Sequence, residues 1–222
     1  MKRKDALVTG EIYHVFNKSI AHYKIFNDEQ DFLRITQMIR YYRANKTPLP
    51  FSAFLRTAEV AVKGMDLSIQ ECLDQKDNLV QLVGYCIMPT HLHFILKQSK
   101  ENGITKFVGN LLNSYSRYFN TRHGRRGPLW VGPFKNVRVE TNEQLLHLTR
   151  YVHLNPVTAS LVGNPHEWAA HSYHEYISEQ TSPALCDFKD LVNIVGKGYQ
   201  TFVEEHIDHQ KRLAKIKHLL FD

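Results

Sequence analysis

The chain has 222 residues, of which 43% are hydrophobic and 11% aromatic, so it can bury a sizeable core as one domain, or as one domain with a small appendage. No apolar run approaches the ~18 residues of a membrane span, and the charged N-terminus lacks the apolar segment of a signal peptide. The three cysteines are widely spaced, which excludes a disulfide framework and a CxxC metal knuckle and favours a reducing cytoplasm. We therefore expect a cytoplasmic protein without a membrane segment.

The net charge of +6 is concentrated in one block of the chain. Residues 102–139 contain no Asp or Glu, and they hold aromatic side chains together with a set of basic residues: Lys106, Arg117, Arg122, Arg125, Arg126, Lys135 and Arg138. Such a surface suits phosphates and unstacked bases. A solvated helix face followed by a basic loop has the same composition, so charge alone leaves both interpretations open. Trp130, in the same block, either stacks on a base or plugs the core.

The first half of the chain predicts a strand, a helix and a strand pair. Residues 11–17 alternate as a strand does, and residues 32–42 have helical apolar spacing after an acidic start. Residues 79–96 are strand-like, with a bend at 88–90. The mixed stretch 44–78, broken by Pro48 and Pro50, is interpreted as an insertion between the first helix and the strand pair.

The second half predicts a helix, a strand and a further helix. The helix spans residues 104–119, and residues 134–139 follow a Gly-rich loop as a strand. Thr141 and Gln144 form a capping box for a helix that Pro156 is expected to close. This order predicts an α+β fold with helices packed on one face of a mainly antiparallel sheet. Beyond residue 178 we expect helices at 188–194 and 199–220, forming a C-terminal extension over 178–222.

The stretch MPTHLHFIL places two histidines in an apolar strand. Residues i and i+2 of a strand share a face, so His91 and His93 point together while Leu92 and Phe94 face the core. Two imidazoles can present two nitrogen ligands to one divalent cation, leaving an open site that oxygen atoms complete. Such open sites are typical of metals that activate phosphodiesters.

The helix that follows Thr141 carries His147, Tyr151 and Asn155 on one face, at spacing i, i+4 and i+8. A tyrosine hydroxyl beside a metal-bound phosphate can attack phosphorus when a cation or base favours its phenolate. Asn155 can offer its amide oxygen to the same metal. For His147 the roles of ligand, base and wet surface residue stay open, with the last favoured.

Two other tyrosines and one other histidine compete for roles in this site. Tyr115 falls on an apolar helix stripe, which favours a core role, and Tyr118 is interpreted as a base-stacking or surface group. His14 alternates into the first strand, where a satisfied core histidine is the more common case. Tyr151 is favoured over both tyrosines as the nucleophile, in part because of the family resemblance described next.

Four segments, taken together, resemble the single-tyrosine HUH transposases, and most closely the REP-associated tyrosine transposase branch. They are EIYHVFNKS, GYCIMPTHLHFIL, SYSRYFNTRHGRRGPLWVGPFK and RYVHLNPVTASLV, in the family's order. The resemblance covers about residues 10–177. A lone HUH pattern is weak, whereas the ordered set with YxxxNPV is specific.

The resemblance implies a ferredoxin-like core over residues 1–177, with Mg²⁺ or Mn²⁺ held between His91, His93 and the tyrosine helix. Tyr151 matches the nucleophile, which would cut single-stranded DNA at or near a hairpin, leaving a 5′-phosphotyrosine and a free 3′-OH. Asn155 matches the polar residue one turn later. DNA contacts are expected from the basic block and its tryptophan: Arg117, Arg122, Arg125, Arg126, Trp130, Lys135 and Arg138. A homodimer is possible in such a family, as is a monomer.

Two other functions stay open at this point. A nucleic-acid-binding protein that kept the fold and lost the chemistry would show salt-sensitive binding without metal-dependent cleavage. A replication initiator or relaxase would use the same chemistry, although those proteins usually have longer chains. The favoured interpretation is an enzyme of DNA transposition or REP-element processing.

Overall fold

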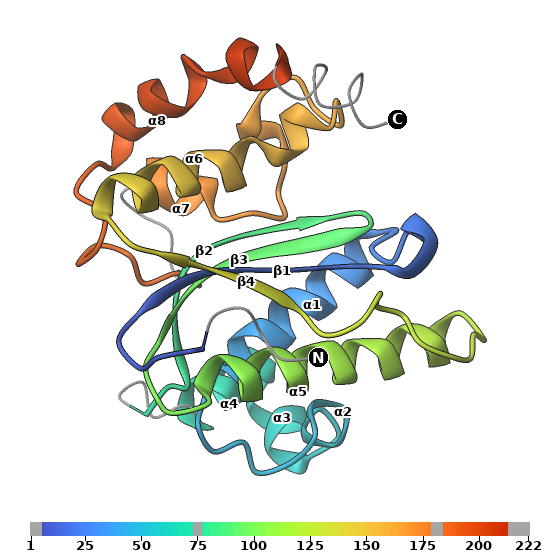
Figure 1. Cartoon of the computed structure of the whole chain (residues 1–222). Helices are drawn as coiled ribbons and strands as arrows, with labels where there is room; N and C mark the ends of the chain where they lie inside the picture. The colour runs from blue at the N-terminus through green and yellow to red at the C-terminus, as the bar shows by residue number, and fades with distance from the viewer. Residues whose placement is uncertain (1–5, 73–76, 179–183, 213–222) are drawn as a thin grey trace.

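The computed structural model of the chain describes residues 6–72, 77–178 and 184–212. Its centre is one antiparallel sheet with strand order β2-β3-β1-β4, shown in Figure 1. The strands are β1 (Ile12–Lys18), β2 (Val80–Met88), β3 (His91–Gln98) and β4 (Lys135–Val139). With one helix after β1 and one after β3, the chain follows the ferredoxin-like split βαβ arrangement. The α+β fold with an antiparallel sheet is thus confirmed.

Two long helices cover one face of the sheet (Figure 1). They are α1 (Glu29–Tyr42) and α5 (Gly103–Arg122), which pack against each other as well. The α1 N-cap forms because the Asp28 carboxylate accepts a hydrogen bond from the Asp31 backbone N–H. The apolar stripe of α5 reaches the sheet where Phe107 meets Phe94 of β3, with ring centroids 6.0 Å apart. Even-numbered β3 residues therefore face this layer.

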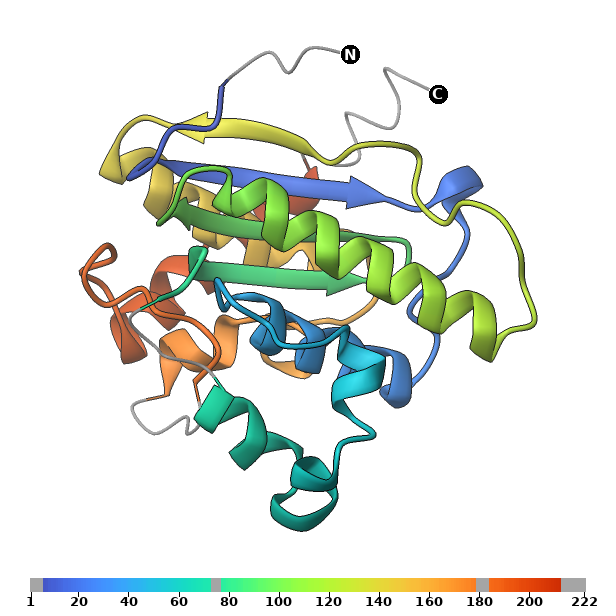
Figure 2. The same ribbon diagram turned by 90° about the horizontal axis from the view of Figure 1, so that it is seen from below.

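The helices are not confined to that face. As Figures 1 and 2 show, α6 (Asn142–Thr158), α7 (Tyr173–Ile177) and α8 (Gly196–Glu204) form a second layer over the opposite face. The short helix η2 (Pro165–Glu167) lies in the connection from α6 to α7. The second layer exists because both faces of β2 are buried, so the sheet needs cover on both sides. The sequence predicts helices on one face of the sheet, and α1 and α5 match this prediction. Helix α6 covers the other face, which the sequence does not predict.

The segment before α7 also covers the outer edge of β2. The Ile87 N–H donates to the Ala170 carbonyl, and the Ser172 N–H donates to the Tyr85 carbonyl. These bonds satisfy backbone groups that an exposed edge strand would leave open. The α6 and α7 side of the molecule is thereby fixed to the sheet at two places.

The insertion 44–78 contains three short helices: α2 (Phe51–Phe54), α3 (Ala58–Lys63) and α4 (Met65–Cys72). Phe51 and Phe54 are buried against Tyr41 of α1, with ring centroids 5.2 Å and 4.7 Å from it. A further short helix, η1 (Ile20–His22), follows β1. The insertion therefore extends the layer of α1 and α5 and leaves the α6 face free.

Two expectations for helix boundaries need correction. Helix α6 runs through Pro156 to Thr158, so the proline does not close it. Residues 188–194 contain only a single turn, at 189–191, where the Leu191 and Val192 N–H groups both donate to the Phe188 carbonyl, and they form no helix. Of the helix expected at 199–220, α8 and residues 207–212 are helical, and the part beyond 212 lies outside the described residues. In the ranges that the structure describes, no helix is long and apolar enough to cross a membrane.

Candidate active site

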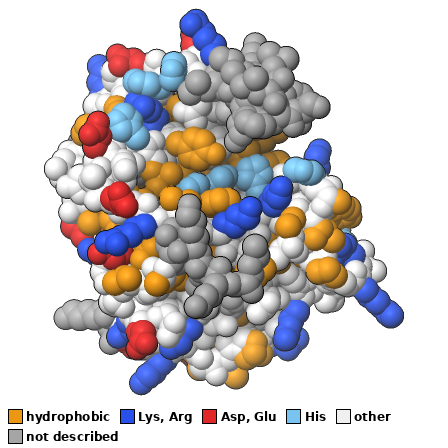
Figure 3. Space-filling model, viewed as in Figure 1, with side chains coloured by type: hydrophobic (Ala, Val, Ile, Leu, Met, Phe, Trp, Pro, Cys, Tyr) orange, Lys and Arg blue, Asp and Glu red, His pale blue; other side chains and the backbone are white. Residues whose placement is uncertain are grey.

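The alternation of β3 puts two histidines on the face that α6 covers. His93 is nearly buried and His91 is partly buried, and their ring centroids are 5.1 Å apart. Leu92 and Phe94 are fully buried on the α5 side. The shared face that the sequence predicts for the two imidazoles is present. In Figure 3 histidine and hydrophobic side chains reach the surface together in the middle of the molecule, with Lys and Arg side chains beside them.

Both imidazoles are held through their Nδ1 atoms. Nδ1 of His93 lies 2.9 Å from Nε2 of His14 on β1, and Nδ1 of His91 lies 3.0 Å from the hydroxyl oxygen of Thr90. A histidine that donates from one ring nitrogen presents the other as a lone pair. In that tautomer, Nε2 of each histidine is free to bind a cation, and the partner at Nδ1 orients the ring.

The site also keeps its histidines uncharged. Burial lowers the pKa of His14 and of His91 to about 4, and it lowers the pKa of His93 well below its usual range. The three imidazoles are neutral at pH 7 for this reason. Neutral imidazole is the form that ligates metals.

Tyr151 lies over this pair on helix α6, whose first turn is capped because the Thr141 hydroxyl accepts from the Gln144 N–H. Its ring centroid is 6.0 Å from that of His93 and 6.1 Å from that of His14, edge-on to both. The side chain remains 42% exposed, so a large substrate can reach it. Partial burial raises the pKa of the Tyr151 phenol. The hydroxyl is therefore protonated at neutral pH until another group stabilises the phenolate.

Asn155 follows Tyr151 by one helical turn and is buried. Its amide Nδ2 donates to the carbonyl oxygen of Val152 at 3.4 Å. This leaves the Oδ1 atom as the part of the amide that can bind a cation. His147, one turn before Tyr151, is exposed and lies 2.8 Å from the Arg150 guanidinium through its Nδ1. That position matches a wet surface residue.

The donor set of this face fits an open metal site. In the described part of the chain, no group of three or more His, Cys, Asp or Glu side chains could hold a metal ion. Two neutral imidazole nitrogens, even with the amide oxygen that the sequence predicts from Asn155, are too few for a closed site, so water or phosphate oxygens would have to complete the shell. The mixed nitrogen and oxygen donors suit Mn²⁺ better than Mg²⁺, which prefers oxygen ligands.

The basic residues that the sequence assigns to DNA divide into two groups. Arg122 bonds Asp28 and the fully buried Asp31, and Arg138 pairs with Glu11 at 2.9 Å. The guanidinium of Arg125 donates to backbone carbonyls of its own loop. In contrast, three basic side chains have neither an ion pair nor a side-chain hydrogen bond within the described residues: Arg117, Arg126 and Lys135. Lys135 is two strands from His93 on the same sheet face, through the pairs Lys135–Phe16 and Phe16–His93.

Three aromatic residues of the basic block are part of the protein's own packing. The Trp130 indole N–H donates to the Ser116 hydroxyl at 3.0 Å and is partly buried. Tyr115 is fully buried and donates to the Ile25 carbonyl, and burial raises the pKa of its phenol far above the usual range. The Tyr118 hydroxyl donates to Asp31 at 3.1 Å. Both rival tyrosines lie in the layer of α1 and α5, away from His91 and His93.

The residue that sequence reasoning missed is His14. Alternation places it on the same face of β1 as Phe16, and Phe16 is the cross-strand partner of His93. A predicted β1–β3 register would have placed His14 beside the histidine pair, but no motif in the chain supplies that register.

Comparison with known proteins gives a family resemblance and a fold. Residues 58–155 match the sequence model of a family described as transposase IS200-like, and this range contains the two β3 histidines, Tyr151 and Asn155. The match confirms the predicted resemblance to the IS200-like, single-tyrosine transposases. No protein with a curated description matches the chain significantly.

Two solved structures are similar to the chain. One is a REP-associated tyrosine transposase bound to a REP hairpin, with a TM-score of 0.53 and 11% identity, covering 88% of this chain and 99% of the other. At this identity the likeness shows the fold alone. The second is a proposed transposase from Deinococcus radiodurans R1, with a TM-score of 0.35 and 16% identity, covering 68% of this chain and 95% of the other.

Proposed function

We propose that this chain, which shares its segment 58–155 with the IS200-like transposases, is a metal-dependent nuclease and strand transferase of single-stranded DNA. The observation that carries the proposal is the position of Tyr151. Its ring lies edge-on to His93 and His14, on the sheet face that also bears His91. Tyr151 is 42% exposed, so a DNA strand can reach its side chain.

In the proposed reaction the Tyr151 Oη atom attacks a phosphodiester. A bond forms between Oη and phosphorus, and the bond from phosphorus to the 3′ oxygen breaks. The phenol proton is lost and the departing 3′ oxygen gains a proton, so the products are a 5′-phosphotyrosine and a 3′-OH. Attack by the 3′-OH of another strand reverses the step and joins the new DNA ends.

His91, His93 and the Oδ1 atom of Asn155 would hold Mg²⁺ or Mn²⁺, which supplies charge stabilisation for the phosphate and for the tyrosine oxygen. His14 acts through His93, because its Nε2 atom holds Nδ1 of His93 and fixes the ring. Helix α6 positions the nucleophile: its capped N-terminus and buried face fix the backbone from which Tyr151 projects. Lys135, on the same sheet face, is placed to contact the DNA backbone.

A substrate with a hairpin and a short single-stranded flank is the best candidate, because the similar solved structure holds a REP hairpin. Incubating the protein with Mn²⁺ and a labelled strand of that kind should yield a covalent protein–DNA adduct that resists denaturation. Tyr151→Phe should abolish the adduct. Tyr118→Phe, a substitution of the same size at a rival tyrosine, should retain it.

The outcome also separates the alternatives. An adduct that survives Tyr151→Phe would refute the assignment of the nucleophile. Salt-sensitive DNA binding without any metal-dependent adduct would identify a binding protein that lacks the chemistry.

A further inference from the structure

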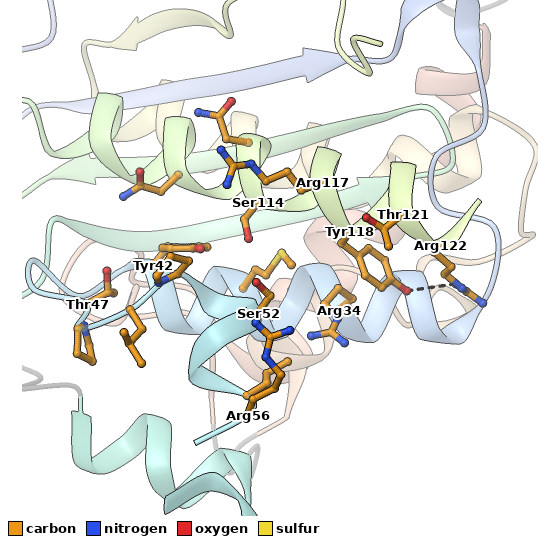
Figure 4. A pocket seen from close by; sticks show the side chains of 17 residues that line it. Arg34, Tyr42, Thr47, Ser52, Arg56, Ser114, Arg117, Tyr118, Thr121 and Arg122 are labelled. Carbon is orange, nitrogen blue, oxygen red and sulfur yellow. Dashed lines mark hydrogen bonds between the residues drawn. The ribbon is translucent and has the colours of Figure 1, made fainter. Parts of the chain in front are cut away.

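A large cavity lies on the other side of the sheet from Tyr151. It has a volume of about 920 Å³ and opens between α1, the segment 47–56 of the insertion, and the outer face of α5 (Figure 4). Its volume is at the upper end of the range for small-ligand sites. One wall comes from the insertion, which is not part of the split βαβ core.

The lining of this cavity is basic and contains no Asp, Glu, Lys or His. It includes four arginines: Arg34, Arg56, Arg117 and Arg122. The charge of Arg122 is neutralised by its ion pairs with Asp28 and Asp31, so Arg122 lines the cavity without attracting an anion. The other three have no ion pair among the residues that the structure describes. Three uncompensated positive charges around one cavity attract an anion.

Arg34 is held in place without a carboxylate. Its guanidinium carbon lies 4.9 Å from the ring centroid of Tyr118 and 5.5 Å from that of Phe51. Stacking on aromatic faces fixes the guanidinium plane, and its N–H donors form no ion pair with any residue that the structure describes. Figure 4 shows Arg34, Arg56 and Arg117 around the same hollow, from α1, the insertion and α5. A guanidinium that is fixed in this way is suited to phosphate oxygens.

The remaining polar lining suits a ligand larger than a phosphate ion. Asn110, Asn113, Ser114 and Arg117 line the cavity from α5, at spacings that put them on one helix face. Amide groups can both donate to and accept from the edge of a nucleobase. Ser52 brings a hydroxyl from the insertion side.

We propose that this cavity is a nucleotide-phosphate site, in which Arg34, Arg56 and Arg117 bind phosphate oxygens and the α5 amides contact a base. The nucleotide comes either from a single-stranded part of a DNA ligand, outside the cleavage site, or from a free nucleotide. The proposal goes beyond the proposed nuclease activity and does not require it. It also gives part of the insertion a binding role.

The test measures binding in EDTA, so that metal-dependent cleavage cannot interfere. The probes are a labelled oligothymidylate of about 12 nucleotides and, separately, labelled ATP. Arg34→Gln, Arg56→Gln and Arg117→Gln are compared with Lys197→Gln, which removes one exposed positive charge from α8. For the oligonucleotide, each cavity substitution should reduce the slope of log K against log salt by about 0.7, and the control should not. ATP, if it is the ligand, should bind at least several-fold more weakly to the cavity variants only.

A cavity-specific loss with either probe supports the phosphate site and identifies the source of the nucleotide. Unchanged affinity and salt slope with both probes, in all three folded variants, overturns the proposal. A thermal melt shows whether Arg34→Gln disturbs the aromatic packing. Arg56 and Arg117 are exposed, so substitutions there should not disturb the fold, and they keep the test valid in that case. The Tyr151 adduct assay is read separately. If the protein forms the adduct but the cavity substitutions leave nucleotide binding unchanged, only the cavity site is refuted. If the cavity substitutions weaken binding but no adduct forms, only the nuclease activity is refuted.

Discussion

Replacing His14 by phenylalanine tests the support of the proposed metal site most directly. The change keeps a ring of similar size in the contact with His93, whose plane lies within 14° of the His14 ring. It removes the 2.9 Å hydrogen bond between the two imidazoles. Without that partner, nothing favours the His93 tautomer in which Nε2 is unprotonated. His93 is only 7% exposed, so water cannot fully replace the lost bond.

The expected magnitude follows from this geometry. A buried polar atom left without a partner costs about 1–3 kcal/mol, and ~1.4 kcal/mol corresponds to a tenfold change in an equilibrium constant. Loss of an outer partner of a metal-binding histidine typically weakens metal affinity by about 10–100-fold. We therefore expect His14→Phe to weaken Mn²⁺ binding within that range. His14→Gln, which keeps a hydrogen-bonding group, should lose less.

Isothermal titration of Mn²⁺ into the folded variants measures the effect, with His166→Phe as a control at an exposed histidine of η2. Adduct formation at saturating Mn²⁺ should recover in His14→Phe, since the nucleophile is intact. An Mn²⁺ affinity that stays within about twofold of the parent protein would refute the role assigned to His14.

Three further predictions concern stability. His153→Phe should lower the free energy of unfolding by about 2–4 kcal/mol in urea denaturation, because the buried Tyr199 and Ser172 hydroxyls each lose a 2.7 Å hydrogen bond to the imidazole; an unchanged midpoint would contradict this. Burial lowers the pKa of His171 from 6.5 to about 3, so the unfolded chain binds the extra proton, and stability should decrease as the pH falls through 6.5 toward 3. His171→Phe should flatten that decline by at most about 1.4 kcal/mol per pH unit, and an equally steep decline would exclude the histidine as a cause. Asp31→Asn should lower the melting temperature more than Asp28→Asn, because Asp31 is fully buried beside Arg122 whereas Asp28 is exposed; equal shifts would show that burial is not decisive.

The parts of the site that local patterns encode were predictable from the sequence. Alternation along β3 placed His91 and His93 on one face, and the capping pair Thr141 and Gln144 located the start of α6. Helical spacing then put Asn155 one turn after Tyr151. These inferences need only the repeat of a strand or a helix, which neighbouring residues determine.

The parts that depend on long-range partners were not predictable. His14 enters the site only through the register of β1 against β3. Composition gave Arg122 the same weight as Arg117, yet its partner Asp31 lies 91 residues earlier in the chain. Trp130 likewise fills the gap beside Ser116, which the basic character of its loop does not indicate. The DNA contacts assigned to these basic residues therefore stay predictions.

The path of α6 through Pro156 shows how a broken local rule serves the site. A proline has no N–H to donate to the carbonyl four residues earlier, which here is that of Val152. The Asn155 side chain supplies a donor to that same carbonyl, so the helix continues to Thr158 instead of ending. The bond also fixes the orientation of the Asn155 amide and leaves Oδ1 without a role in the helix. The NP pair of the sequence thus accounts both for the continued helix and for an oriented oxygen one turn beyond the proposed nucleophile.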